Sequence, residues 1–475
     1  MRRYALSGLF LVAALPVLLG AQGFGIYEQG TCAMGRAGTG VAAPCADGSA
    51  IFFNPAGLAG LTGRHATIGI TLIDVHGGFT DDILRQQTDI DNPLIPVPQI
   101  YVTYAATPKL GVGVGVFAPY GLQTRWPLSF DGRFAGYDNI LRSVYIQPTV
   151  AYQVTPWLAL GGGLDIALGK VELNQRLDLA DAPVDPSLGV PAGTVFGQFG
   201  IAPGTDFANA HLEATKTTVT AHWGGLITVN DKLSIGGRYL MHAKFDYAGT
   251  AEFTQVLTNL TLPATITVGS LTLPAGTPID VLLSAPPPPA PPPNGLYLFN
   301  TVLRNQTVST SITNPEQVVF GLVYKVRPDL TLLGDYQFTR WGKRFYQLNI
   351  NFQDAPDRVL HERYDNTNGF RFGAEWVKDA KWTFRGGYLY HEGAAPAETV
   401  TPLLPEGNRN EFTAGFTVKL ARGLTGDLAY QYIRQNDRRG RTRETRFNQP
   451  PTTLLNHGVY TFYAHLFGVS LSYAF

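Results

Sequence analysis

The chain has little charge and few of the groups on which enzyme active sites depend. Charged residues make up 15% of its 475 residues, and 36 basic side chains balance 36 acidic ones. Without net charge the chain has no field that would attract nucleic acid, so no nucleic-acid partner is expected. Its nine histidines are scattered and no Gly-x-Ser-x-Gly motif is present, which disfavours a barrel-embedded hydrolase with a Ser-His-acid triad.

Long apolar runs are missing everywhere except at the start of the chain. Beyond residue 21 no stretch approaches the roughly 18 uncharged apolar residues that indicate a membrane-spanning helix. At the start, two arginines precede an apolar run from Ala5 to Gly20, which predicts a secretory signal peptide over residues 1–21. A membrane anchor is the alternative, but the run is shorter than the roughly 20 residues of a spanning helix, and Pro16 interrupts it.

Glycine and aromatic residues, in contrast, are abundant. The chain has 53 glycines, and Phe, Trp and Tyr make up 12% of it. In an exported protein of low charge, this composition is typical of a transmembrane β-barrel. A large secreted β-sandwich remains an alternative on composition alone.

Several segments alternate with a period of two. In residues 110–116 apolar side chains alternate with glycine, and residues 158–168 and 467–475 alternate apolar with small or polar residues. Such a strand has one face suited to lipid and one suited to a lumen. A soluble antiparallel sheet with one wet face has the same pattern.

The connections between these segments favour the barrel. Short turns such as "TPK" at 107–109 and "RPD" at 327–329 alternate with long polar or proline-rich connections, as periplasmic turns and extracellular loops do. We therefore predict an all-β fold, a 14-stranded antiparallel transmembrane β-barrel in the outer membrane of a Gram-negative bacterium. The barrel is expected over residues 64–475, with long extracellular loops at 119–142, 174–215, 248–306 and 435–458. The predicted strands lie near 64–75, 98–107, 109–120, 143–154, 157–172, 216–229, 232–247, 307–326, 329–340, 367–377, 381–391, 410–420, 423–434 and 459–475.

Residues 22–63 precede the first strand and are apolar but irregular. They contain the only two cysteines, Cys32 and Cys45, which are expected to form one disulfide in an exported protein. A metal site is disfavoured because the usual partner ligands are missing nearby, and no cofactor is expected. We predict that this segment lies inside the barrel as a plug; a disordered leader is the alternative.

The third predicted strand and the residues behind it are unusual. Gly111, Gly113 and Gly115 weaken the strand and Pro119 removes a ladder hydrogen bond, so we expect a bend there. Apolar side chains follow on a loop that is predicted to be exposed, and such a cluster indicates a landing site for an apolar ligand. The alternative is that they pack the loop onto the barrel rim. These side chains are Phe117, Tyr120, Leu122, Trp126, Leu128, Phe130 and Phe134.

Short motifs recur in order along the mature chain: Gly23–Phe24, Gly35–Arg36–Ala37, Asn54–Pro55–Ala56, Tyr120–Gly121–Leu122, Trp382–Arg385 and a terminal Tyr473–Phe475. In this order and spacing they resemble the FadL/TodX family of outer-membrane transporters for hydrophobic compounds. The resemblance implies that an N-terminal hatch blocks the barrel. It also implies that cargo, such as long-chain fatty acids, passes from an extracellular apolar site to an internal pocket, to which we assign Phe24 and Ile26, and leaves sideways near the third strand.

The chain departs from the family at one point. Fatty-acid transporters of this family hold the carboxylate with basic side chains, and our alignment places Leu168 and Asn349 at those positions. Burying a carboxylate without a partner is costly. Either Lys170, Lys343 or Arg344 replaces the missing base, or the cargo is an uncharged aromatic or alkane hydrocarbon.

Partners are expected among the components of the outer membrane. The terminal Phe475 predicts recognition by the barrel-insertion machinery, and a monomer is expected. The arginine-rich stretch at 438–446 suggests contact with lipopolysaccharide phosphates, although a merely solvated loop fits equally well. A structural or adhesive barrel is the remaining alternative to transport, but it gives the plug no purpose.

Overall fold

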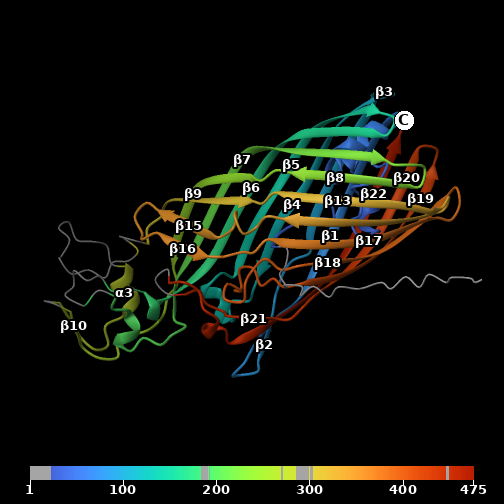
Figure 1. Cartoon of the computed structure of the whole chain (residues 1–475). Helices are drawn as coiled ribbons and strands as arrows, with labels where there is room; N and C mark the ends of the chain where they lie inside the picture. Colours follow the sequence, from blue (N-terminus) through green and yellow to red (C-terminus); the bar gives the residue numbers. More distant parts are fainter. Residues whose placement is uncertain are drawn as a thin grey trace, which may run out of the picture.

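The structure, a computed structural model, describes residues 23–475 except 183, 185–190, 192, 269–270, 285–298, 300–302 and 446–448. The predicted signal peptide lies outside these described residues. The body is a closed antiparallel barrel of 14 strands, as predicted, and it forms the tilted cylinder of Figure 1. Its wall consists of β1 (Arg64–Asp81), β3 (Ile95–Thr107), β4 (Leu110–Arg125), β5 (Asp138–Thr155), β6 (Leu158–Asp178), β7 (Asp206–Thr228), β8 (Leu233–Leu240) continued by β9 (Ala243–Gln255), β12 (Gln306–Asn314) continued by β13 (Gln317–Arg327), β14 (Leu330–Thr339), β17 (Thr367–Val377), β18 (Trp382–His391), β19 (Arg409–Ala421), β20 (Leu424–Gln435) and β22 (Gly458–Ala474).

The first and last wall strands close the barrel. β1 and β22 pair without a break from His65↔Ala474 to Asp81↔Gly458. Beyond this ladder, the backbone groups of Arg64 and Phe475 exchange hydrogen bonds of 3.2 and 3.0 Å. Closure leaves no open sheet edge, which in hydrocarbon would carry unpaired backbone groups. Among the described residues, no helix is long and apolar enough to cross a membrane.

Connections at one end of the barrel are turns of two to four residues, and those at the other end are long loops. The long loops cover 82–94, 126–137, 179–205, 256–305, 340–366, 392–408 and 436–457. The four loops predicted at 119–142, 174–215, 248–306 and 435–458 are shorter in the structure because the strands are long: β6 has 21 residues and β7 has 23, where a spanning strand needs roughly 9–11. These loops contain the short elements β2 (Gln87–Asp89), η2 (Asp131–Phe134), η3 (Leu179–Asp181), η5 (Phe196–Phe199), β10 (Ile266–Val268), β11 (Leu271–Leu273), α3 (Ile279–Ser284), β15 (Gln347–Phe352), β16 (Arg358–His361), β21 (Arg438–Gly440) and η8 (Thr453–Leu455).

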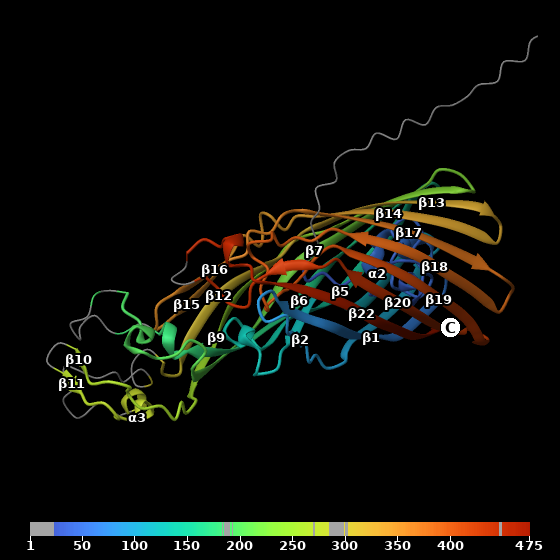
Figure 2. The same cartoon turned by 90° about the horizontal axis from the view of Figure 1, so that it is seen from below.

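The long strands carry a separate apolar cluster beyond one side of the barrel. Loops 179–205 and 256–305 pack there around Leu179, Phe196, Phe207 and Leu283. Figures 1 and 2 show this projection at the end of the barrel that bears α3 and β10, away from the C-terminus.

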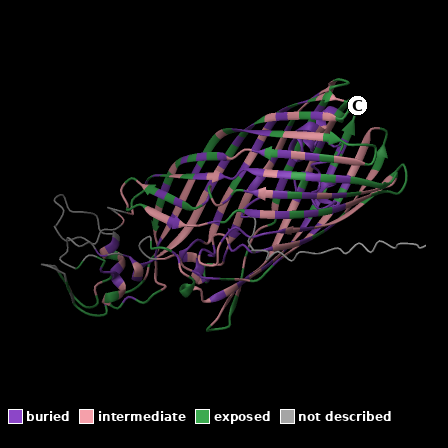
Figure 3. Ribbon diagram, in the orientation of Figure 1, coloured by how far each residue is buried: buried purple, intermediate pink, exposed green. Residues whose placement is uncertain are grey.

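The alternation read from the sequence sets the two faces of the wall. On β6 Leu164 and Leu168 are 57% and 43% exposed, whereas Asp165 and Ala167 between them are fully buried. Figure 3 shows the same change of class from residue to residue along many strands. The exposed side chains are mostly apolar and face outward, so the outer surface suits lipid and the lumen takes the small and polar residues.

Two wall strands predicted to be continuous are interrupted. Residues 241–242 separate β8 from β9, and Pro315 and Glu316 separate β12 from β13. The two interruptions face each other, because Leu240 pairs with Gln317 below them and Ala243 pairs with Asn314 above them. Proline has no N–H for the ladder, which accounts for the break at Pro315.

Residues 23–63 lie in the lumen and contain α1 (Thr31–Met34), α2 (Ala50–Phe53) and η1 (Pro55–Gly60). α1 contacts β1, β19, β20 and β22, whereas η1 contacts β3 to β7 on the other side of the barrel. The segment, blue in Figure 1, therefore spans the bore near the end that carries the C-terminus. We call residues 23–63 the lumen segment.

Candidate functional site: a cavity that crosses the barrel wall

Polar contacts fix the lumen segment to the wall. The Asn54 side chain donates to Val41 O at 2.6 Å and to Gly225 O of β7 at 2.9 Å, and it caps η1 by accepting from Ala56 N at 3.1 Å. Pro55 occupies the first position of η1, where its missing N–H is not needed. The Asn-Pro-Ala motif thus both starts a helical turn and ties it to the wall.

A second anchor lies on the opposite wall. The buried guanidinium of Arg36 donates to Glu375 at 3.1 Å, and Arg385 donates to the same carboxylate oxygen at 2.7 Å. Gly35 lies so close to the backbone of Gly415 that a Cβ would stand 3.2 Å from its Cα. Close backbone packing and a shared carboxylate hold α1 against β17 to β19.

Cys32 and Cys45 are joined by a disulfide in the lumen segment. Together with Asp47 they make up the one group of possible metal ligands among the described residues. Because the two sulfurs are bonded to each other, they are not free to bind a metal.

The glycines of β4 have a different role from the predicted one. Gly111, Gly113 and Gly115 stay in register with both β3 and β5, so the expectation that they bend the strand is wrong. A Cβ on Gly111 would lie 2.2 Å from the carbonyl oxygen of Leu58, and one on Gly115 would lie 2.8 Å from the Ile51 side chain. These glycines let the lumen segment approach the wall.

The irregularity of β4 lies further along the strand, between Phe117 and Tyr120, where its register with β5 shifts at Pro119. Its pairing with β3 ends at Ile100↔Val116, although β3 extends to Ile95 and β4 to Arg125. At the far end the two sides meet again, because the Asn92 side chain bonds to the backbone of Gln123 and Arg125 at 2.9 and 2.6 Å. The wall therefore contains a gap between residues 95–99 and 117–122, closed at both ends.

The sequence of β3 suits a free edge. Ala105 N donates to Gly63 O on the β1 side, and hydrogen-bonding directions alternate along a strand. Pro96 and Pro98 therefore direct their backbone nitrogens toward the gap. Since proline has no N–H, neither leaves an unpaired donor there.

The start of the lumen segment pairs with the β4 side of the gap. Ile26 N donates to Pro119 O and Gly121 N donates to Phe24 O, each at 2.9 Å. The buried side-chain amide of Gln29 bonds both backbone groups of Ala118, donating to its oxygen at 2.8 Å and accepting from its nitrogen at 2.9 Å. Residues 24–29 thus replace the missing strand partner of β4.

A cavity of about 400 Å³ lies at this gap. Its lining includes Phe24, Ile26 and Val97 on the lumen side, together with Pro96, Pro98 and Arg142, which are exposed on the outer face of the wall. Because residues of both faces line one cavity, the cavity connects the lumen with the outer surface of the barrel. Most of the lining is apolar, which suits a hydrophobic ligand.

The inner end of the cavity is acidic. Glu28, Glu406 and Glu411 line it, and Arg409 is the cation beside them. Burial, with repulsion from Glu411, raises the pKa of Glu28, and burial also raises the pKa of Glu406. Arg409 donates to Gly23 O at 3.2 Å. Among the lining residues at this end carboxyl groups outnumber guanidinium groups, and Arg371 and Arg438 lie close enough to lower the pKa of these carboxyls.

Comparison with known proteins assigns the chain to a family. The profile of a family described as "Outer membrane protein transport protein (OMPP1/FadL/TodX)" matches residues 12–475. The chain belongs to this family.

Its similarity to individual members is distant but covers nearly the whole chain. Outer membrane protein P1 of Haemophilus influenzae is 22% identical over 96% of the chain and 95% of its own length. The long-chain fatty acid transport protein of Escherichia coli K12 is 21% identical over 98% and 97%. Among solved structures, a Pseudomonas aeruginosa FadL homologue matches with a TM-score of 0.75 at 18% identity over 96% and 100%. The toluene transporter TodX of Pseudomonas putida matches with 0.66 at 15% over 96% and 99%.

As an OMPP1/FadL/TodX protein, the chain is located in the outer membrane. That its long loops lie on the extracellular side stays a prediction. Of the predicted binding residues, Phe24, Ile26, Tyr120 and Leu122 line the cavity. Phe117 lies deeper, fully buried against Phe52 of the lumen segment. Their role in binding stays a prediction.

Three predicted binding residues lie elsewhere. Leu168 faces outward on β6, so its assignment to a site in the lumen is wrong. Lys170 lies on the same face and is held by Glu172 and Glu213 at 3.0 and 2.7 Å. Asn349 is exposed on β15 in an extracellular loop. None of the three lines the cavity, so none of them replaces a carboxylate-binding base there.

The expected landing cluster is buried instead of exposed. Trp126 donates its indole N–H to Pro402 O at 3.1 Å and packs on Phe130, whose ring also lies 5.7 Å from Phe79. Leu128 alone of the named loop residues after Trp126 is largely exposed, at 47%. The aromatic side chains thus pack the loop inside the barrel rim, which was the alternative interpretation.

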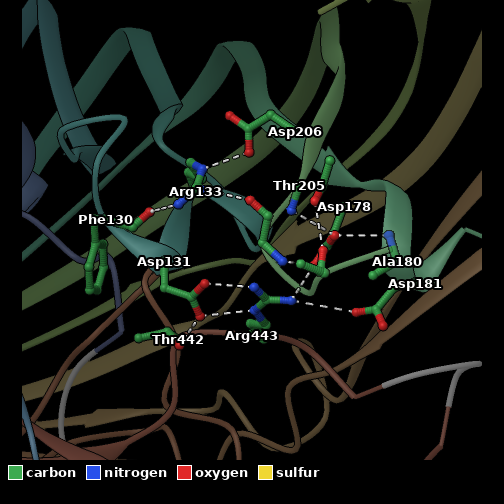
Figure 4. A network of polar contacts seen from close by, with 12 residues as sticks. Phe130, Asp131, Arg133, Asp178, Ala180, Asp181, Thr205, Asp206, Thr442 and Arg443 are labelled. Carbon is green, nitrogen blue, oxygen red and sulfur yellow. Dashed lines mark hydrogen bonds and ion pairs between the residues drawn. The ribbon is translucent and has the colours of Figure 1, made fainter. Parts of the chain in front are cut away.

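The arginine-rich loop is held by acidic residues of other loops. Arg443 forms ion pairs with Asp131, Asp178 and Asp181, as Figure 4 shows, and Arg133 holds Asp206 nearby. Arg439 pairs with Asp82, and Arg441 is buried. These arginines lock extracellular loops together, so their donors are not free for lipopolysaccharide phosphates.

Sequence reasoning missed Gln29, Pro96, Pro98 and Arg409. The two prolines carried a usable signal, because proline at alternate positions of a strand indicates a free edge. Gln29 and Arg409 carried none, since their partners are remote in sequence.

Proposed function

We propose that the chain carries hydrophobic molecules passively across the outer membrane and releases them sideways through the gap between β3 and β4. The observation that supports this most directly is the cavity whose lining belongs to both faces of the wall. A molecule in it moves from the lumen to the lipid without crossing the lumen segment. The cargo leaves chemically unchanged, in keeping with a family of transport proteins.

The route begins, in this proposal, on the extracellular side. A small apolar pocket between β6, β7, β9, β12 and β15 is lined by Val171, Leu212, Tyr247, Ile312 and Leu348. It takes the place of the buried aromatic cluster as the candidate capture site. Residues 24–29, which pair with β4 beside the cavity, act as the hatch that gates entry to the gap.

Chemical labelling tests the lateral route. Pro98→Cys places a thiol on the outer face beside the gap, and Val102→Cys places one on the same face of β3 where it pairs with Val114 of β4. Both variants, reconstituted into liposomes, are treated with a bulky maleimide, and entry of an uncharged fluorescent hydrophobic probe is timed. The native cysteines are oxidised and do not react.

Labelling at position 98 is expected to lower the protein-dependent entry rate at least about tenfold, since the adduct fills the only lipid-facing part of the route proposed here. Labelling at position 102 should leave the rate unchanged. Equal rates for the two labelled variants would refute lateral release, and no protein-dependent entry in the unlabelled protein would favour a structural or adhesive barrel.

The acidic inner end favours an uncharged cargo over a fatty-acid anion. Arg409 lies beside Glu406 and Glu411 and donates to Gly23 O, so a cargo carboxylate would have to compete with these groups for it. Uptake of a long-chain carboxylate should therefore be slower than uptake of its methyl ester. Faster uptake of the carboxylate would instead favour fatty acids as the cargo.

Two further proposals concern partners. Phe475, exposed at the end of β22, is proposed as the signal for the barrel-insertion machinery, and deletion of this residue should lower the amount of folded protein in the outer membrane. The chain is proposed to act as a monomer, which analytical ultracentrifugation in detergent would test.

A further inference from the structure

The facing interruptions in the wall mark a particular height in the membrane. A strand break inside the hydrocarbon leaves backbone groups without partners, and there is no water to satisfy them. Residues 241–242 and 315–316 interrupt adjacent strands at the same level. Met241 N and His242 O nevertheless have partners in β7, the Ala221 carbonyl and the Thr220 hydroxyl, each at 2.9 Å, so the side chains around the break decide the height of this level.

The side chains on either side of the interruptions place this level at the polar boundary of the outer leaflet. On the side toward the short turns, Tyr239, Phe320 and Tyr336 are exposed on the outer face. Aromatic residues of this kind form the belt at a membrane boundary. On the side toward the long loops, the exposed outward residues are Lys244 and Asp246 of β9 and Arg340 after β14. The change from aromatic to charged side chains occurs across the break.

Glu316 organises the charges at the break. Its carboxylate accepts from Arg344 at 2.7 and 3.2 Å and from Arg340 at 3.1 Å. Arg344 also donates to His242 Nδ1 at 3.0 Å. One carboxylate thus holds two guanidinium groups in place, and the charge of one of them is not compensated.

More cations surround this pair. Lys244 bonds Asp246 at 2.8 Å with its side chain 58% exposed, and Lys216 is exposed near the same carboxylate. Lys343 is exposed between the two arginines in the chain. We call Lys216, Lys244, Arg340, Lys343 and Arg344 the strand-break patch. Its five cations exceed Glu316 and Asp246, the two carboxylates whose interactions with these cations are described above.

We propose that the strand-break patch binds the phosphate groups of lipopolysaccharide, the anionic glycolipid of the outer leaflet. Arginine and lysine next to a lipid-facing surface, at the height of the headgroups, have the charge and position to bind a lipid phosphate. The apolar surface below, including Phe320, receives the acyl chains of the same molecule. The patch takes over the role that the sequence suggested for the loop 438–446. In the described part of that loop, Arg439, Arg441 and Arg443 are engaged within the chain.

Lipid retention tests the proposal on the full mature chain. The variant K244Q/R340Q/K343Q removes three cations and keeps Arg344, which remains paired with Glu316. The matched control K325Q/K378Q/K381Q makes the same charge change at exposed positions of the short-turn end. Each protein in phospholipid nanodiscs is titrated with bisphosphorylated lipid A, and bound lipid is counted by native mass spectrometry. Retarded migration of unheated protein on gels confirms that each barrel is folded.

Lipid A is expected to bind wild type and the control equally, and the patch variant about a hundredfold more weakly, from a factor of about five for each cation near an anionic surface. Dephosphorylated lipid A should bind all three proteins as weakly as the patch variant binds lipid A. Millimolar inorganic phosphate should not displace bound lipid A, because the acyl chains contribute to its binding. Equal retention by the patch variant and the control, or retention that does not depend on the lipid phosphates, would overturn the proposal.

Discussion

Replacing Gln29 by leucine tests whether the lumen segment acts as the hatch of the gap. The Gln29 amide is the partner of both backbone groups of Ala118, and the phenol of Tyr101 bonds to the backbone oxygen of Gln29 at 2.5 Å. Leucine keeps the size of the side chain and the backbone bond to Tyr101. It removes the two hydrogen bonds that join residue 29 to β4 beside Pro119.

The size of the effect follows from the groups left without partners. An unpaired buried backbone group costs about 1–3 kcal/mol, so two of them cost about 2–6 kcal/mol. Because the adjacent cavity gives water access to one side, we expect about 3 kcal/mol, which is about a hundredfold change in the equilibrium between attached and detached hatch.

Hydrogen exchange measures this equilibrium at two reporter amides. Ile26 N and Gly121 N are bonded across the junction between the lumen segment and β4, and both should exchange about a hundredfold faster in Gln29→Leu. Probe entry into liposomes should rise in parallel. Gln153→Leu is the matched control, because that amide donates only to Thr155 O near a short turn and does not touch the lumen segment.

Unchanged exchange at Ile26 and Gly121 would show that the Gln29 amide does not hold the hatch. Equal acceleration in Gln153→Leu would show a general loosening of the barrel. Faster exchange without faster probe entry would show that the Gln29 amide holds the hatch to β4 but that the hatch does not gate entry of the probe.

Three further predictions concern the lumen segment and an extracellular loop. Arg36→Ala leaves Glu375 with only Arg385 and should destabilise the folded barrel by about 3 kcal/mol. The measurement is the temperature at which the protein changes its mobility on gels, which should fall. Arg85→Ala, at an exposed loop position, should leave this temperature unchanged. Gly111→Ala puts a Cβ against Leu58 O and should make the protein leaky to small ions in planar bilayers. Gly237→Ala is the control, because its Cβ would meet nothing nearer than 3.6 Å. Equal conductance of the two variants would contradict the argument that Gly111 allows close packing of the lumen segment. Burial, with repulsion from Glu444, raises the pKa of Glu362 in loop 340–366 from its usual 4.5 to about 8. Between these values the folded state holds a proton that the unfolded chain has lost. The free energy of unfolding should therefore fall as pH rises from 4.5 to 8. Glu362→Gln should remove that part of the pH dependence of thermal unfolding, and an unchanged profile would contradict it.

The architecture was predictable because local patterns set it. Alternation along β6 and β22 determined which side chains face lipid, the contrast between short turns and long loops favoured a barrel, and counting the strand-like runs predicted 14 strands. The same alternation assigned Leu168 to the outer face, in conflict with its assignment to the pocket by alignment with the family. The periodicity was right, because side chains in a strand must alternate, whereas an alignment at such low identity can slip by one residue and reverse the face.

The details of the site depended on contacts between residues far apart in the chain. Glycines at 111, 113 and 115 fit both a weak strand and a close approach of another segment, and only the position of Leu58 and Ile51 distinguishes the two. Loop aromatics such as Trp126 look like an exposed landing site until Pro402 and Tyr460 are placed around them. The arginines of 438–446 look free until Asp131 and Asp178 arrive from other loops.

The position of the lumen segment has a consequence for biogenesis. This segment leads directly into β1, and β1 forms the seam with β22, the last strand to be made. The folded, disulfide-linked insert contacts strands on opposite sides of the closed cylinder, α1 against β19 to β1 and η1 against β3 to β7. The cylinder must therefore be wrapped around its own beginning, with the seam zipped last, and a mutant that frees the leading residues before zipping should accumulate as an empty shell.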